Sequence, residues 1–118
     1  MIDLMARIGP ESALVAHSLE QAAWHQTRAL AYLRQARGPQ SDALPPDERR
    51  ALHLQALKHL VQAQRLVRQA QQASRSPAQA LVLAERLARL QAIAEEVERE
   101  ASQRYLATEV ADGAPQRG

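Results

Sequence analysis

The sequence predicts an all-α fold, a bundle of three long helices. Ala, Leu, Gln, Arg and Glu dominate the composition, and these residues favour helices. Aromatic residues make up 3% of the chain, with one Trp, two Tyr and no Phe, so residues that favour strands are scarce. Apolar residues recur at spacings of three and four over three long segments, which is typical of coiled-coil-like packing.

The first predicted helix spans about residues 10–37. Pro10 suits the first turn of a helix, because proline lacks an amide hydrogen that this turn would leave unpaired. Gly38 followed by Pro39 ends the helical pattern. The Pro-rich segment 39–45 is predicted to be a linker between the first and second helices.

The second predicted helix spans about residues 46–73, and the third spans about residues 77–110. Acidic residues directly after Pro46 favour the start of the second helix, where the helix dipole is positive. Ser76 and Gln79 have the spacing of a capping box, which predicts a sharp start for the third helix.

The length of 118 residues predicts a single domain over residues 1–110, followed by a disordered tail over residues 111–118. With so few aromatics, its core must be built from Leu, Val and Ala, so each helix buries a shallow stripe. A thin core of this kind predicts that the bundle is completed by oligomerisation.

The short connection between the second and third helices predicts an antiparallel hairpin. In the resulting register Leu60 lies opposite Leu90, and Arg50 lies opposite Glu100. Three glutamines fall on the apolar seams of the helices. These glutamines are Gln26, Gln64 and Gln71. Their amides either form buried hydrogen bonds that fix the register or reach water where the bundle splays.

Several classes of function find no support in the sequence. There is no Cys, and no apolar stretch is long enough to span a membrane, so we expect a cytoplasmic protein without disulfides. The four His lack the spacings within one helix that hold a metal ion, and no nucleophile or phosphate-loop motif occurs. We therefore predict no catalytic residue, no cofactor and no metal.

The first helix carries a second face that points away from its apolar seam, with Trp24 almost opposite the seam. Trp, Tyr and Arg are typical anchors of protein interfaces. Near the end of the third helix, Tyr105 and Leu106 extend past the start of the second helix and also need cover. The predicted interface on the first helix consists of Leu14, His17, Gln21, Trp24, His25, Arg28 and Tyr32. The alternative is that this face is simply a second buried side within the chain.

The leading hypothesis is a non-enzymatic interaction protein, an assembly subunit, adaptor or chaperone-like partner that binds another copy or a different protein. The alternative is a small basic subunit of a nucleoprotein complex, because the second helix is rich in cations. Its candidate phosphate contacts are Lys58, Arg68 and Arg75.

Overall fold

The computed structural model describes the backbone of residues 10–113 and the side chains of residues 13–103. Three long helices follow one another, α2 (Pro10–Arg37), α3 (Pro46–Ala73) and α4 (Pro77–Gly113). A 3-10 helix, η1 (Ser41–Ala43), joins α2 to α3. The described chain contains no strand, and the predicted all-α class is confirmed.

The predicted helix bounds agree with the structure except at the end of α4. That helix continues to Gly113, three residues beyond the predicted end, and so includes the first part of the predicted tail. The rest of that tail, residues 114–118, lies outside the described residues.

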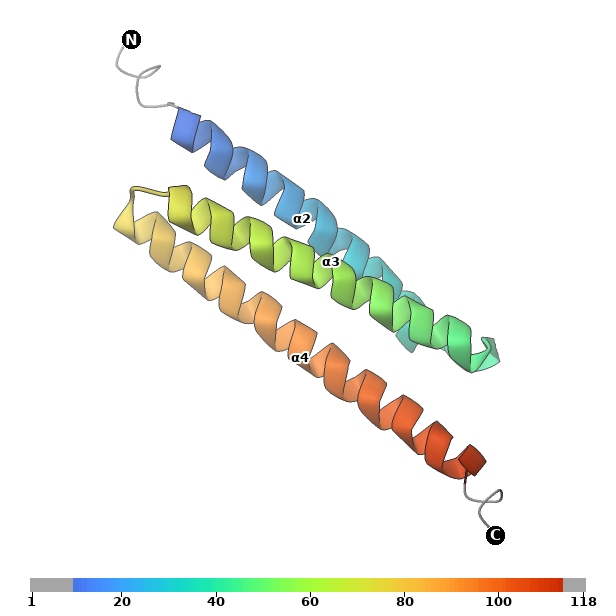
Figure 1. The fold of residues 1–118 in the computed structure, drawn as a ribbon. Coiled ribbons are helices and arrows are strands. Elements are labelled where there is room, and N and C mark those ends of the chain that lie inside the picture. Colours follow the sequence, from blue (N-terminus) through green and yellow to red (C-terminus); the bar gives the residue numbers. More distant parts are fainter. Residues whose placement is uncertain (1–9, 114–118) are drawn as a thin grey trace.

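The three helices form an up-down-up arrangement with α3 between the other two (Figure 1). The chain reverses at each connection, so α2 and α4 run in the same direction and α3 runs against both. α3 packs along α2 more extensively than along α4. It is therefore the central element of the bundle.

The turn after α2 is ordered by Gly38 and η1. A Cβ on Gly38 would lie 2.9 Å from the carbonyl oxygen of Arg34, closer than real Cβ atoms come, so only glycine fits there without a shift. The amide of Ser41 donates to the carbonyl of Gly38 at 3.0 Å, and the residue is buried. The segment predicted as a simple linker is thus a structured turn.

The cap predicted for α4 is present in part. Ser76 Oγ accepts a hydrogen bond from the amide of Gln79 at 3.2 Å, as a capping residue does. The side chain of Gln79 does not complete the box in the usual way, because its Oε1 accepts from Ser74 Oγ at 2.6 Å. The result ties the α3–α4 connection to the first turn of α4.

Small residues allow α2 and α3 to approach closely. The hydrogen bond between His25 and His59 places the two helices in an antiparallel register in which Ala22 lies close to level with Ala63, and Ala29 with Ala56. Ala occupies every seventh position on both sides, and each of these residues is fully buried: Ala22, Ala29 and Ala36 on α2, and Ala56, Ala63 and Ala70 on α3.

Larger side chains fill the core between α3 and α4. Leu60 and Leu90 are buried in the same cluster, as the predicted hairpin register requires, and so are Val67 and Leu83. The three seam glutamines are half-buried, and the two alternatives for their amides stay predictions.

Candidate interaction site

Aromatic and imidazole rings gather where the middle of α2 packs on α3. Trp24, His25, Arg28 and Tyr32 come from α2, and His59 comes from α3. We refer to these five residues as the aromatic–histidine cluster. Spacings of three, four and seven residues bring the α2 members to one side of their helix, and the register of α3 adds His59.

Trp24 is the exposed aromatic member of the cluster, with 53% of its surface in solvent. Its indole meets the ring of His25 edge-on at a centroid distance of 4.9 Å and that of His59 at 5.8 Å. The guanidinium of Arg28 lies over the indole, 5.4 Å from its centre. These contacts hold the indole in place while leaving much of it uncovered.

The two histidines are half-buried beneath the indole and hydrogen-bonded to each other. Their Nδ1 atoms are 2.8 Å apart, so the Nδ1–H of one ring donates to the Nδ1 lone pair of the other. Tyr32 stacks on His59 with an interplanar angle of 14°. Burial lowers the pKa of His59, and the nearby His25, Arg28 and Lys58 lower it further, which favours the neutral ring that accepts or donates this bond.

The structure divides the predicted interface on α2 into two parts. His25 and Tyr32 are half-buried against α3. The alternative interpretation, a second buried side within the chain, expected this for the whole face. Tyr105 and Leu106 lie beyond the residues whose side chains are described. The remaining residues are exposed and form a face that we call the α2 outward face: Leu14, His17, Gln21, Trp24 and Arg28.

His59 was missed in the sequence because it lies 34 residues from His25. The seven-residue alanine spacing shared by the first and second predicted helices does not reveal this contact. Pairing the three alanines of one helix with the three of the other, with Ala29 opposite Ala63 at the centre, would place His25 level with Val67 rather than with His59.

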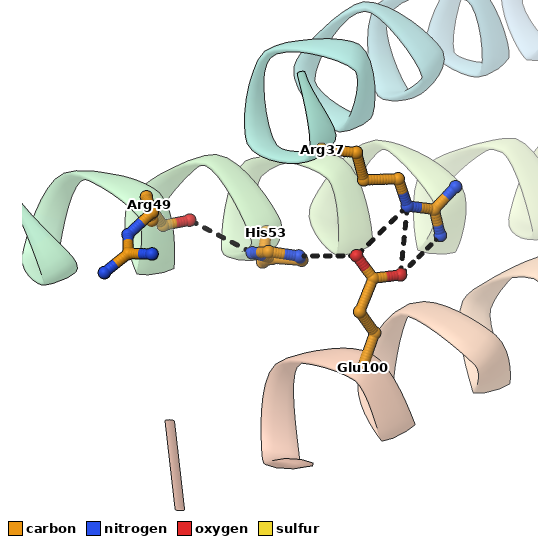
Figure 2. A network of polar contacts seen from close by, with 4 residues as sticks. All are labelled: Arg37, Arg49, His53 and Glu100. Carbon is orange, nitrogen blue, oxygen red and sulfur yellow. Dashed lines mark hydrogen bonds and ion pairs between the residues drawn. The ribbon is translucent and has the colours of Figure 1, made fainter. Parts of the chain in front are cut away.

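A second group of polar residues connects all three helices at the other end of α2 (Figure 2). Arg37 of α2 donates from Nε to both carboxylate oxygens of Glu100 of α4, at 3.1 and 2.9 Å, and its Nη2 lies 2.7 Å from Oε2. His53 of α3 donates from Nδ1 to the carbonyl of Arg49 at 3.1 Å, and its Nε2 lies 3.4 Å from Oε1 of Glu100. The carboxylate of Glu100 is therefore shared by α2 and α3.

Electrostatics favour the ionised form of this carboxylate. The hydrogen bonds from Arg37 hold the pKa of Glu100 below its usual value, and the contact with His53 acts in the same direction, whereas burial opposes them. The predicted partner of Glu100, Arg50, was wrong. Arg37 takes that place because α2 and α4 meet at this end, which a hairpin of two helices cannot predict.

The candidate phosphate contacts are exposed but are not gathered in one compact site. Lys58 and Arg68 lie on the outer side of α3, about 15 Å apart along its axis, and Arg75 lies in the α3–α4 connection. Binding of nucleic acid through these residues stays a prediction.

Among residues with described side chains, no group of three or more His, Asp or Glu comes together in a way that could hold a metal ion. In the described part of the chain, no helix is long and apolar enough to cross a membrane. Comparison with family models found no match, and comparisons with curated proteins and with solved structures found none either. The fold and the site thus define a three-helix bundle whose most distinctive surface is the α2 outward face.

Proposed function

We propose that this chain is a non-enzymatic, cytoplasmic interaction protein that assembles with further copies of itself through the α2 outward face. The observation that carries the proposal is Trp24, a large apolar ring that is 53% exposed yet held by its neighbours. A rigid, exposed Trp gives much buried area on association and loses little side-chain entropy.

The charges on either side of Trp24 favour a second copy as the occupant of this face. Glu20 lies one turn before Trp24 and Arg28 lies one turn after it, and all three are exposed. If two copies of α2 pack antiparallel about a two-fold axis at Trp24, Glu20 of each copy lies level with Arg28 of the other. The face is self-complementary in charge as well as apolar at its centre.

The polar network supports a structural role over a catalytic one. A His–carboxylate pair can act in acid–base chemistry only if it reaches a substrate. His53 is completely buried, and its ring hydrogen-bonds to the carbonyl of Arg49 within its own helix. These contacts favour a pair that fastens helices together.

Replacing Trp24 with Ala is expected to reduce the oligomer to the monomer. The substitution removes the central apolar contact of the proposed interface, and central aromatic anchors contribute about 2 kcal/mol or more to association. The absolute mass, measured by light scattering behind a sizing column at several concentrations, checks this result.

Leu81→Ala is the matched control, because Leu81 is a still more exposed apolar residue on α4. Its mass is expected to equal that of the unsubstituted chain. If the unsubstituted chain is a monomer at every concentration, or if the two substitutions lower the mass equally, self-assembly through the α2 outward face is contradicted. Absorbance of the same peak at 260 nm tests the nucleic-acid alternative, because bound nucleic acid raises it.

A further inference from the structure

His25 and His59 present two ring nitrogens to each other across two different helices. Their Nδ1 atoms are 2.8 Å apart, and the ring centroids are 5.1 Å apart. Each helix is anchored by the fully buried alanines of the α2–α3 interface, so the two backbones hold the rings at this separation. Neither ring is fully buried, and the pair lies at the edge of the interface.

The separation of the two nitrogens matches the spacing of two ligands on one metal ion. Imidazole nitrogens bind divalent transition metals at about 2.0 Å. Two such nitrogens in neighbouring positions of a square-planar ion are about 2.8 Å apart, whereas a tetrahedral ion separates them by about 3.3 Å. Square-planar or tetragonal geometry is the preference of Cu²⁺ and Ni²⁺.

We propose that His25 and His59 form a two-ligand site for a divalent transition metal ion of the Cu²⁺ or Ni²⁺ type. Both rings bind through Nδ1, after rotations of the rings turn the two lone pairs from each other toward a common point. The ring that carries its proton on Nδ1 in the hydrogen bond changes tautomer, so this proton moves to Nε2 and none is lost. Water fills the remaining positions around the ion.

The surroundings of the pair set limits on its affinity and selectivity. Arg28 and Lys58 are close enough to lower the pKa of His59, and the same two positive charges oppose a bound cation. Two imidazoles bind first-row divalent ions in an order that peaks at Cu²⁺, with Ni²⁺ and Zn²⁺ weaker. We therefore expect a site of moderate affinity that prefers Cu²⁺, and Arg28→Gln is expected to strengthen it.

Trp24 provides a direct readout of this site. It is the one Trp of the chain, and its ring lies 4.9 Å from that of His25 and 5.8 Å from that of His59. Bound Cu²⁺ or Ni²⁺ quenches the emission of an indole at this range. Titrating the full chain, prepared without a histidine tag, with Cu²⁺ and with Ni²⁺ is expected to give saturable quenching at one ion per chain.

Three variants test which residues bind the ion. His25→Gln and His59→Gln are each expected to weaken the saturable quenching at least tenfold, because the loss of a ligand costs more than the roughly 10–100-fold of a lost second-shell partner. Glu98→Gln, which changes an exposed residue of α4 outside both the cluster and the α2 outward face, is expected to leave it unchanged. Circular dichroism checks that each variant keeps its helices.

A metal ion that binds only the folded chain also raises its midpoint of thermal unfolding. This rise is expected in the unsubstituted chain and in Glu98→Gln, but not in the other two variants. Quenching that never saturates, or that saturates equally well in His59→Gln, would overturn the metal site. The result is independent of self-assembly, because both ligands belong to one chain and Trp24 is retained in every variant.

Discussion

Leu60→Ala is expected to lower the free energy of unfolding by about 2–5 kcal/mol. Leu60 is fully buried at the middle of α3, the helix that packs on both of the others. Ala at this position removes three carbons from a core whose buried members are Leu, Val and Ala. Denaturant unfolding followed by circular dichroism, with all variants at one protein concentration, measures the loss.

Val61→Ala is the matched control, because it truncates the next residue of the same helix, and Val61 is 46% exposed. We expect a change of no more than about 0.5 kcal/mol. Equal losses for the two substitutions would contradict the placement of the core between α3 and its neighbours.

Glu100→Ala is expected to cost about 1–3 kcal/mol. The substitution leaves Nε2 of the buried His53 without its carboxylate and removes the ion pair with Arg37. Glu98→Ala changes an exposed acid of the same helix and is expected to change stability by less than about 0.5 kcal/mol. If both variants unfold at the same denaturant concentration, the carboxylate of Glu100 does not hold the helices together.

The contribution of Glu100 is also expected to depend on pH. Its pKa is lowered in the folded chain by the hydrogen bonds from Arg37, from an ordinary value of 4.5. A carboxyl whose folded pKa is depressed stabilises the fold above its unfolded pKa, and this stability is lost as the pH falls through the folded pKa. The difference between the unsubstituted chain and Glu100→Ala is thus expected to be constant above about pH 5.5 and to shrink below pH 4.5.

The helices could be predicted from local signals because the residues that end them act locally. Gly38 ends α2 because a side chain would strike the carbonyl of Arg34, and Ser76 caps α4 with its own hydroxyl. The register of α3 against α4 could also be predicted from the sequence, since a connection of three residues allows few ways to pair the two helices. Burial of Leu60 and Leu90 in one cluster followed from it.

The contacts of α2 with the other helices could not be predicted from the sequence in this way. The segment between α2 and α3 contains η1, whose turn decides which residues of the two helices are level. Without that register, His25 had no visible partner, and Arg37 could not be placed near Glu100. The aromatic–histidine cluster and the polar network around Glu100 both depend on contacts between residues far apart in the sequence.

The self-complementary charge of the α2 outward face also allows a test by exchange. Glu20→Arg alone and Arg28→Glu alone each place like charges together in an antiparallel pair of α2 helices, which disfavours association. The double variant Glu20→Arg with Arg28→Glu restores opposite charges between the two copies. If a different protein binds this face instead, its binding is not expected to return in the double variant, because its own charges are unchanged.

The most direct test of assembly through α2 is therefore the absolute mass of four proteins by light scattering at low salt. These are the unsubstituted chain, the two single variants and the double variant. We expect an oligomer for the unsubstituted chain, a lower mass for each single variant and an oligomer again for the double variant. Four equal masses, or a double variant that stays as dissociated as the single ones, would contradict a self-complementary interface centred on Trp24.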